Sequence, residues 1–227
     1  MEELFQDLSN SQTLKDKVYL NLRELIISGK IKPGSRLPEE ELSKQMNISR
    51  APIREALNML EREGFTTIIP RKGAIVTEVT PELARDIWEM RRVLEPYAAR
   101  TSMAAIPKSE IIRIDGLVKQ TIEHPDNLDL YVTCDLELHE MLYKYGTNRY
   151  LKDYIATTVG HSLRVRYFVE YNESLSEAAV ADVYQEHSEI MDALKAQDAD
   201  MLHAKVLHHV SNSLLRCESA LDGNEKV

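Results

Sequence analysis

The chain of 227 residues has only two cysteines and no long run of apolar residues. Cys134 and Cys217 stand far apart without the close pairing of zinc or redox motifs, so a disulfide framework is excluded and reduced thiols are expected. No segment reaches the roughly 20 apolar residues of a membrane-spanning helix, and the N-terminal segment is acidic where a signal peptide would be basic. We therefore expect a cytoplasmic protein without a membrane partner.

Glycine and proline are also scarce, with eight of each in the chain. Pro107, Pro125 and Gly146 separate stretches with helical periodicity, and Thr80 followed by Pro81 forms a good helix start. We expect helices near residues 81–104, 108–123, 127–145, 148–171, 176–196 and 199–219. An all-α antiparallel helical bundle is the economical way to pack them.

The N-terminal part of the chain predicts a different structure. Residues 35–76 have the pattern of two short helices joined by a tight turn, followed by a β-hairpin with a basic, glycine-containing tip. Pro38 and the three glutamates after it mark a helix start, because acidic side chains favour the positive end of the helix dipole. Asn47 ends this helix, Ser49 can cap the next one, and Pro52 lies in its first turn. This order predicts a winged helix-turn-helix in a chain that is mainly α.

Arg50 and Arg54 lie one turn apart at the exposed N-terminal end of the second short helix. Such a helix can enter the major groove of DNA, where a guanidinium matches O6 and N7 of guanine. Surface arginines are usually only solvated, but residues 14–77 hold 12 Lys/Arg against 8 Asp/Glu, whereas residues 78–227 hold 16 against 26. The net charge of −9 therefore conceals a basic N-terminal region, which favours DNA binding.

The same residues resemble the DNA-binding domain of the GntR family of bacterial regulators. That family has an opening helix that ends in glycine, then Pro-Gly, an R-L-P-E segment and the pattern S-R-x-P-[IV]-R-E-A-L. The corresponding positions here are Gly29, Pro33 with Gly34, residues 36–39 and residues 49–57. The resemblance implies a winged helix-turn-helix that binds double-stranded operator DNA.

The resemblance also implies which residues contact DNA. They are Arg36, Ser49, Arg50 and Arg54, together with Arg71, Lys72 and Gly73 at the wing tip, which would approach the minor groove or its phosphates. Some family members place a DNA-contacting arginine where this chain has Glu40, which leaves base recognition mostly to Arg50 and Arg54 and leaves the operator sequence open. One recognition helix reads few bases, so we expect a homodimer on a palindromic operator.

The predicted C-terminal helices carry polar side chains on their apolar faces. At about 100° per residue, Asp135 and His139 fall within the apolar stripe of one helix, His187 within that of another and His209 within that of the last. His208 faces away. A buried carboxylate needs a partner and an imidazole needs its nitrogens satisfied, and a divalent metal meets both requirements. One inward histidine is usually a hydrogen-bonded core residue, but the four residues together favour a metal site.

This region resembles the FCD ligand-binding domain of the FadR subfamily of GntR regulators. The family pattern is D-x-x-x-H on one helix, E-H-x-x-I-x-x-A-L on another, and a later histidine. Here it corresponds to Asp135 with His139, residues 186–194, and His209, which lies 22 residues after His187. The resemblance implies that these residues bind a divalent cation, often zinc or nickel, and that a small carboxylate effector completes the coordination.

Two arginines are candidates for binding that effector. Arg91 lies at the edge of an apolar stripe, where a family arginine approaches the effector, and Arg92 lies outside the stripe. Arg166 falls inside the stripe of its helix, whereas Arg164 does not. Either candidate could instead pair with a structural acid such as Glu95, and for Arg166 the two interpretations are evenly balanced.

We predict a polar lead-in at residues 1–12, a winged helix-turn-helix at 13–78 and a helical effector- and metal-binding domain at 79–221. Together they predict a homodimeric transcription repressor whose operator affinity changes with a small carboxylate. Two alternatives stay open. A metal-responsive regulator would need no organic effector. A metal-dependent enzyme would need a general base near the metal, which the inward faces lack, and would leave the DNA-binding domain without a use.

Overall fold

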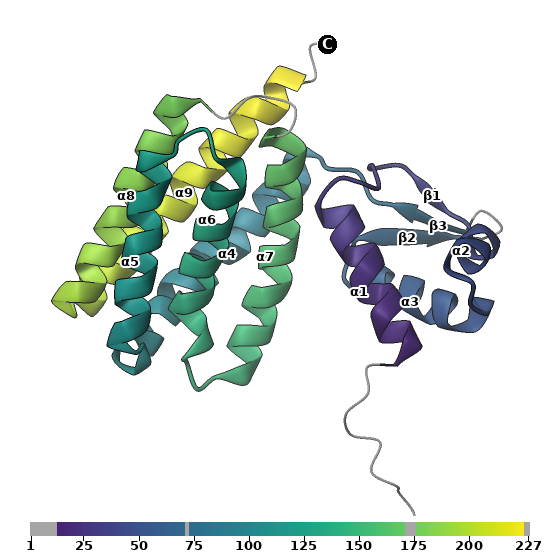
Figure 1. The fold of residues 1–227 in the computed structure, drawn as a ribbon, viewed down its shortest axis with the longest axis horizontal. Coiled ribbons are helices and arrows are strands. Elements are labelled where there is room, and N and C mark those ends of the chain that lie inside the picture. Colours follow the sequence, from purple (N-terminus) through teal and green to yellow (C-terminus); the bar gives the residue numbers. More distant parts are fainter. Residues whose placement is uncertain (1–12, 71–72, 171–175, 225–227) are drawn as a thin grey trace, which may run out of the picture. The chain divides into compact units, whose positions relative to one another are not determined.

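The computed structural model of the chain describes residues 13–70, 73–170 and 176–224. It divides into two compact units, Met1–Glu78 and Val79–Val227 (Figure 1). In the described residues the first unit holds three helices and a small sheet, and the second is helical. This mainly α fold confirms the predicted fold class. No helix in these ranges combines the length and the apolar character that a bilayer crossing requires.

The helices of the N-terminal unit are α1 (Leu14–Ile27), α2 (Glu39–Met46) and α3 (Arg50–Arg62). α1 starts with a capping box, in which the Thr13 hydroxyl accepts from the backbone N–H of Asp16 and the Asp16 carboxylate accepts from the backbone N–H of Thr13. α2 ends at Asn47, whose φ of 52° is left-handed and turns the chain toward α3. Ser49 occupies the N-cap position of α3, but its side chain forms no cap hydrogen bond, so the predicted cap is met in position only.

The sheet of this unit has one strand more than the sequence predicts. β2 (Thr66–Ile69) and β3 (Gly73–Val76) form the expected antiparallel hairpin. β1 (Arg36–Leu37) pairs with the other edge of β3, so the strand order is β1-β3-β2. A two-residue strand has no alternating pattern to detect, and only its pairing with β3 reveals it.

The core of the N-terminal unit lies where α1 packs against α3. Its buried side chains include Leu22, Ile26, Ile53, Leu57, Leu60 and Phe65. All of them except Phe65, which follows α3, recur at helical spacing along α1 and α3. This spacing places the polar N-terminal end of α3, with Arg50 and Arg54, on the exposed side.

The helices of the C-terminal unit are α4 (Pro81–Ser102), the short 3-10 helix η1 (Met103–Ala105), α5 (Lys108–Glu123), α6 (Leu128–Lys144), α7 (Arg149–Glu170), α8 (Glu177–Ala196) and α9 (Ala199–Asn224). Their bounds lie within a few residues of the predicted segments, and α9 runs further, to residue 224. The Thr80 hydroxyl caps α4 by accepting from the N–H of Leu83, and Ser176 caps α8 in the same way.

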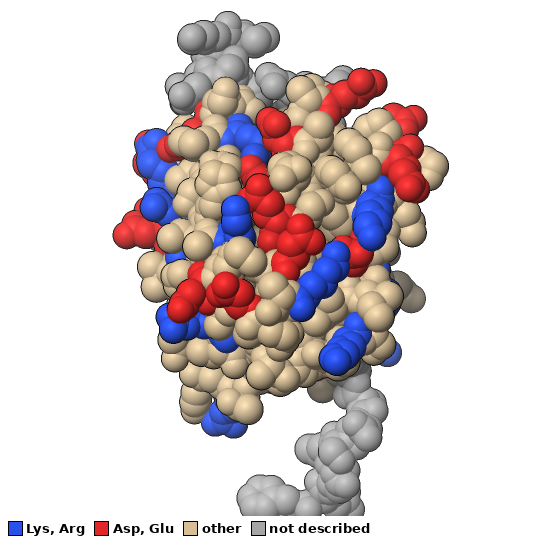
Figure 2. Space-filling model, turned by 90° about the vertical axis from the view of Figure 1, so that its left-hand side faces the viewer, with Lys and Arg blue, Asp and Glu red and all other residues tan. Residues whose placement is uncertain are grey.

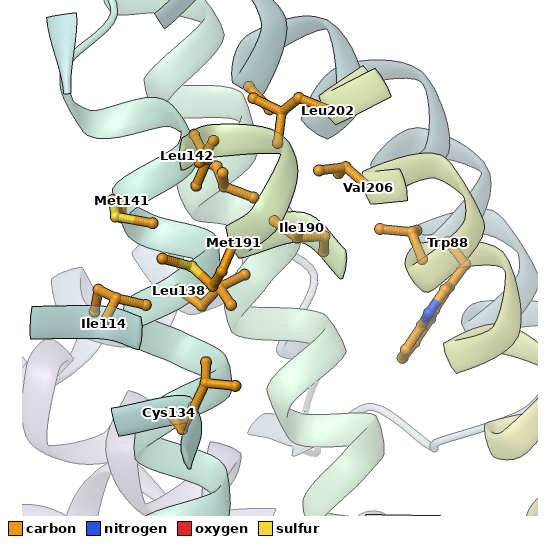
Figure 3. Close-up of a cluster of buried hydrophobic side chains, with 14 of the residues drawn as sticks. Trp88, Ile114, Cys134, Leu138, Met141, Leu142, Ile190, Met191, Leu202 and Val206 are labelled. Carbon is orange, nitrogen blue, oxygen red and sulfur yellow. The ribbon is translucent and has the colours of Figure 1, made fainter. Parts of the chain in front are cut away.

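One apolar core joins the helices of this unit (Figure 3). Buried members from five helices are Trp88, Ile114, Leu138, Met141, Ile190, Met191, Leu202 and Val206. α4 packs against α6, α7 and α9, so its buried face reaches the middle of the bundle. On the side of α5 and α8 the surface instead shows acidic and basic side chains close together (Figure 2).

Candidate metal centre and nucleic-acid interface

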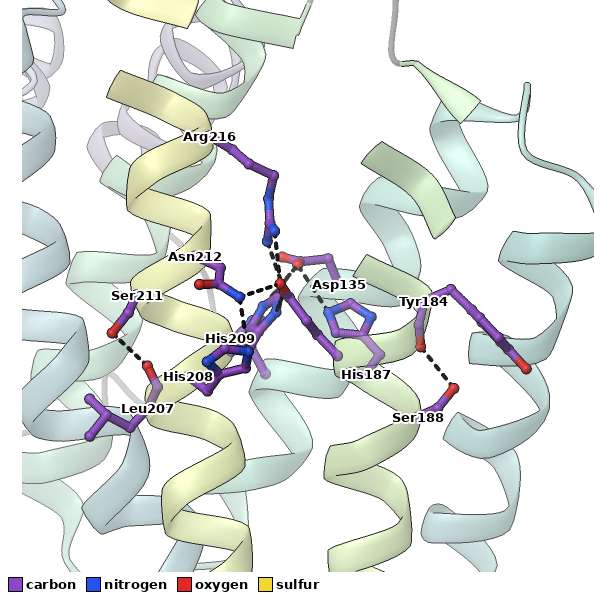
Figure 4. Close-up of polar contacts among 12 residues, drawn as sticks. Asp135, Tyr184, His187, Ser188, Leu207, His208, His209, Ser211, Asn212 and Arg216 are labelled. Atoms are coloured by element: carbon purple, nitrogen blue, oxygen red, sulfur yellow. Dashed lines mark hydrogen bonds and ion pairs between the residues drawn. The ribbon is translucent and has the colours of Figure 1, made fainter. Parts of the chain in front are cut away.

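The four predicted metal ligands come together inside the C-terminal unit. Asp135 and His139 lie one turn apart on α6. His187 comes from α8 and His209 from α9, and both lie beside Asp135 (Figure 4). All four side chains are buried, and one ligand atom from each lies within 4.8 Å of the others. Helical periodicity placed each residue on an inward face, and the packing of three helices brings those faces to one point.

The three histidines present the same ring atom to the carboxylate. Their Nε2 atoms lie 3.7 Å (His139), 3.6 Å (His187) and 3.9 Å (His209) from Oδ1 of Asp135. Metal bonds of 2.0–2.1 Å would separate the ligand atoms of a tetrahedral site by about 3.3 Å, so small side-chain shifts suffice to bind an ion. Nε2 of His187 forms no hydrogen bond within the described part of the chain, which fits a metal-binding nitrogen.

The protonation states of this cluster suit metal binding. Burial lowers the pKa of His187 and lowers that of His209 to about 3, although the hydrogen bond from His209 to Glu186 acts in the opposite direction. Burial alone would raise the pKa of Asp135, but Arg166 and the nearby histidines outweigh it and hold this pKa well below its ordinary value. Two neutral imidazoles and an ionised carboxylate are what metal ligation requires.

Two glutamates lie behind the histidines. Oε2 of Glu95 on α4 is 2.7 Å from Nδ1 of His139, and Oε2 of Glu186 on α8 is 2.7 Å from Nδ1 of His209. From the sequence, Glu95 is expected only as a possible partner for an arginine, and Glu186 only as part of the E-H motif. The sequence could have indicated an acidic residue on an inward helical face. Its pairing with a histidine of another helix could not be predicted, because that depends on how the helices pack.

Arg91 is buried beside the four metal-ligand candidates. It is 2% exposed, its Nε donates to Glu95 at 2.5 Å, and its Nη2 is 3.4 Å from Nε2 of His139. Pairing with Glu95 was the alternative that the sequence left open. A role for Arg91 in effector binding stays a prediction.

A cavity of about 470 Å³ adjoins the cluster. Its wall includes Tyr131, Asp135, Arg166, His209, Ser213, Arg216 and Cys217. Arg166 therefore reaches both the cavity and Asp135, to which its Nη1 donates a hydrogen bond. Arg164, which the helical pattern places outside the apolar stripe, is nevertheless 2% exposed, so that expectation is wrong. Neighbouring helices cover more of α7 than one apolar stripe.

The predicted DNA-reading arginines are exposed on α3 and lie beside acids of α2. Arg54 donates three hydrogen bonds to Glu39, at 2.9, 3.2 and 2.8 Å, and Arg50 lies 3.1 Å from Glu40. The side chains of Arg54 and Arg50 are 64% and 57% exposed. Exposed pairs of this kind contribute little free energy, so both arginines can be released to DNA at small cost.

The remaining predicted DNA contacts lie on the small sheet or outside the described residues. Arg36 on β1 is exposed, and Gly73 starts β3 with a φ of 83°. Arg71 and Lys72, which were assigned to the wing tip, lie outside the described residues.

Comparison with known protein families identifies the family of this chain. Residues 14–76 match the family described as bacterial regulatory proteins, gntR family, and residues 86–212 match the FCD domain. This chain is a GntR-family regulator with an FCD domain. Proteins of this family are DNA-binding transcriptional regulators, and the regulator is accordingly not an enzyme.

Several relatives of the regulator are named repressors. It is 27% identical to the HTH-type transcriptional repressor RspR of Escherichia coli K12, over 89% of this chain and 88% of the relative. It is 28% identical to the gluconate operon repressor of Bacillus licheniformis, over 85% and 79%, and 24% identical to the galactonate operon repressor of Escherichia coli K12, over 88% and 95%.

Solved structures share the fold of the regulator. The structure described as E. coli McbR/YncC superposes with a TM-score of 0.76 at 19% identity and covers 91% of this chain and 98% of its own. A structure described as the metal-free FCD domain of TM0439 superposes with a TM-score of 0.56 at 16% identity and covers 64% and 99%.

Proposed function

We propose that this regulator binds a divalent metal at Asp135, His139, His187 and His209, and that a small carboxylate in the adjoining cavity changes its affinity for operator DNA. The observation that carries the proposal is a buried cluster of metal-binding side chains that opens onto a cavity with an arginine in its wall. Because several relatives are named repressors, we propose repression as the sign of regulation.

The chemistry of the four side chains supports a divalent transition metal. Imidazole nitrogen suits zinc and nickel, and the buried carboxylate adds the negative charge that either ion needs. The description of the TM0439 structure as metal-free treats the metal as a variable of an FCD domain, which supports a metal site in this one. Which ion is bound depends on availability as much as on these ligands.

The charge of the cavity wall supports an anionic effector. Arg166 and Asp135 neutralise each other, so a divalent metal leaves the inner end of the cavity positive. The cavity volume of about 470 Å³ is in the usual range for small-molecule sites. Two relatives are named as repressors of the gluconate and galactonate operons, and both names refer to hydroxy acids.

The effector proposal is tested by operator binding. We expect the zinc-loaded regulator, bound to an operator selected from random DNA, to change its affinity roughly 5- to 150-fold when the right hydroxy, keto or dicarboxylic acid is added, since allosteric couplings are typically 1–3 kcal/mol. Fluorescence anisotropy measures this change. His187→Ala should bind the operator without responding to the acid, and His208→Ala should respond like the wild type.

Two outcomes would contradict this assignment. A response to zinc alone, with none to any acid, would make the protein a metal sensor. An undiminished acid response in His187→Ala would remove the metal from the mechanism. In the same assay, Arg166→Lys should need more acid because a lysine cannot form the bidentate contact of a guanidinium, and an unchanged response would leave Arg166 only as a partner of Asp135.

We propose that the regulator acts as a homodimer through an exposed apolar face of the C-terminal unit. Met90, Val93 and Tyr97 line one side of α4 and are 46%, 66% and 54% exposed. α7 packs against α4 and adds Tyr150 and Tyr154, which are 61% and 63% exposed. Large exposed apolar groups at helical spacing favour a protein partner. A palindromic operator requires that partner to be a second copy.

Sedimentation of matched variants tests the dimer. Val93→Glu should shift the regulator toward a monomer and weaken operator binding, because it places a charge in the middle of the apolar face. Ile112→Glu is the control, since Ile112 on α5 is 73% exposed but outside this face. A Val93→Glu protein that stays dimeric would show that another surface forms the contact.

A further inference from the structure

The carboxylate of Glu186 is enclosed by donors from one face of α9. His209, Asn212 and Arg216, which are labelled in Figure 4, stand at positions i, i+3 and i+7 of that helix. All three form hydrogen bonds with Glu186 on α8. Nδ1 of His209 donates to Oε2 at 2.7 Å, and Nδ2 of Asn212 donates to Oε1 at 2.8 Å. Arg216 donates to both oxygens at 2.9 Å, in the bidentate geometry that suits a guanidinium and a carboxylate.

This arrangement fixes the tautomer and the ring orientation of His209, one of the four metal-ligand candidates. A histidine that donates from Nδ1 to a carboxylate keeps its proton on that nitrogen and exposes the lone pair of Nε2. Nε2 of His209 is the atom that faces Asp135, 3.9 Å away. Glu186 therefore selects both the tautomer and the direction of the ring, while Arg216 and Asn212 hold Glu186 in place.

The two carboxylate–histidine pairs of the cluster differ in their surroundings. Arg91 and Glu95, behind His139, have side chains that are 2% and 3% exposed. Arg216, behind Glu186, has a side chain that is 30% exposed and forms part of the cavity wall. Two hydrogen-bonded contacts, Arg216 to Glu186 and Glu186 to His209, therefore link an arginine of the cavity wall to a metal-ligand candidate that itself borders the cavity.

We propose that Glu186 is a positioning residue for His209, that Arg216 holds Glu186 in position, and that the metal affinity of the site therefore depends on an arginine in the cavity wall. The inference rests on the proposed metal site. It assigns no contact with the metal to Glu186 or Arg216, and both act through the imidazole of His209.

The experiment measures the zinc affinity of the purified full-length protein by competition with a chromophoric chelator. Loss of a carboxylate that orients a metal-binding histidine typically weakens affinity 10- to 100-fold, and we expect a loss of that order for Glu186→Ala. Glu186→Gln keeps an acceptor oxygen for Nδ1, so its loss should be smaller. Arg216→Ala should weaken zinc binding less than Glu186→Ala but more than the controls.

The controls come from the same pair of helices. Glu189 on α8 and Lys205 on α9 form an ion pair at 2.7 Å, and neither belongs to the four metal-ligand candidates. Glu189→Ala and Lys205→Ala remove a contact between α8 and α9 of similar kind and should leave zinc affinity at the wild-type value. A loss in these controls equal to that in Glu186→Ala would show that any α8–α9 contact matters and would overturn the proposal.

A second readout separates positioning from general stability. Cobalt absorption reports the ligand geometry directly, and Glu186→Ala and Arg216→Ala should both change the visible spectrum of the cobalt-loaded protein. They should also reduce the rise in Tm that zinc produces, whereas a purely structural role would lower Tm equally with and without zinc. If Glu186→Ala does not fold, Glu186→Gln and Arg216→Ala test the inference in its place. The inference is refuted if both of these variants bind zinc with the wild-type affinity. A wild-type protein that binds no metal refutes the proposed function instead.

Discussion

The direction of a single side chain around α9 decides whether it can serve as a metal ligand. His209 is 1% exposed and faces Asp135, whereas the adjacent His208 is exposed and lies 3.1 Å from Asn212. Successive residues of a helix are about 100° apart, so neighbours in sequence can have opposite environments. The same rule separates Arg91, which is buried, from Arg92, which is exposed.

The two adjacent histidines make a matched pair for mutation. We expect His209→Ala to lower the metal content of the purified protein, because it removes one of four ligand atoms, and to lower Tm in the presence of zinc. His208→Ala should change neither value. Elemental analysis and thermal unfolding measure the two effects. The opposite result, with His208 required and His209 dispensable, would contradict the assignment of ligands on α9.

Arg54 is the residue with the clearest expected role in DNA reading. Its pair with Glu39 lies on the surface and is screened by solvent, so the pair can open in favour of a base contact. Arg54→Ala should therefore cost about 1–3 kcal/mol of operator binding and relax specificity at one position per half-site.

Binding to operator and to random DNA, measured over a range of salt concentrations, checks this prediction. Arg62→Ala, at the opposite end of α3, is the control and should leave specificity unchanged. An equal loss on both DNAs after Arg54→Ala would assign Arg54 to phosphate contact.

At the scale of elements, turns and caps fix where the helices of each unit begin and end. Gly34 has a φ of 74° and its N–H donates to the carbonyl of Val76, which brings the chain before β1 next to β3. Gly116 lies inside α5, and a Cβ added there would meet no atom within 4 Å. The same residue type therefore has opposite roles, one required by backbone geometry and one unfavourable to its helix.

These two glycines predict stability changes of opposite sign. Gly34→Ala should destabilise the N-terminal unit by about 1–2 kcal/mol, because an alanine is strained in the left-handed region. Glu78, whose carboxylate lies 2.8 Å from the added Cβ, is exposed and can move aside. Gly116→Ala should stabilise α5 by up to about 1 kcal/mol. Chemical denaturation measures both, and a loss of stability in Gly116→Ala would show that α5 needs the glycine for packing.

At the scale of the whole molecule, the chain joins a basic unit to an acidic one. Residues 14–77 carry the excess of Lys and Arg, and residues 78–227 carry the excess of Asp and Glu. Only residues 77–80 separate β3 from α4, the helix that contributes Arg91 and Glu95 to the surroundings of the metal cluster. The DNA-binding domain and the proposed effector site thus belong to different units on one continuous chain, as the proposed regulation requires.

Removal of the metal should lower the Tm of the C-terminal unit and leave that of the N-terminal unit unchanged. A ligand at a concentration roughly 1,000 times its Kd adds about 4 kcal/mol to the free energy of unfolding, so chelation should lower the Tm of the C-terminal unit. The N-terminal unit, which has its own core, should unfold at an unchanged temperature. Calorimetry with and without a chelator measures both transitions, and added zinc should restore the first. An unchanged thermogram after complete metal removal would argue against a structural contribution of the metal.

The local features of this regulator can be predicted from short-range patterns in its sequence. Helical periodicity indicated the bundle helices and the inward faces of Asp135, His139, His187 and His209. The ordered motif from residue 29 to residue 57 indicated the helix-turn-helix, because caps, turn residues and apolar spacing act over a few neighbouring positions.

The pairing of polar groups across helices depends on tertiary packing and could not be predicted from local sequence. The tertiary structure placed Arg91 against Glu95 behind His139, brought Glu186 to His209, and buried Arg164 on α7. Helical phase gives the direction of a side chain but not which residue of another helix it meets, since that depends on how the helices pack. The short strand β1 also depends on tertiary structure, because a two-residue strand forms only through its hydrogen bonds to β3.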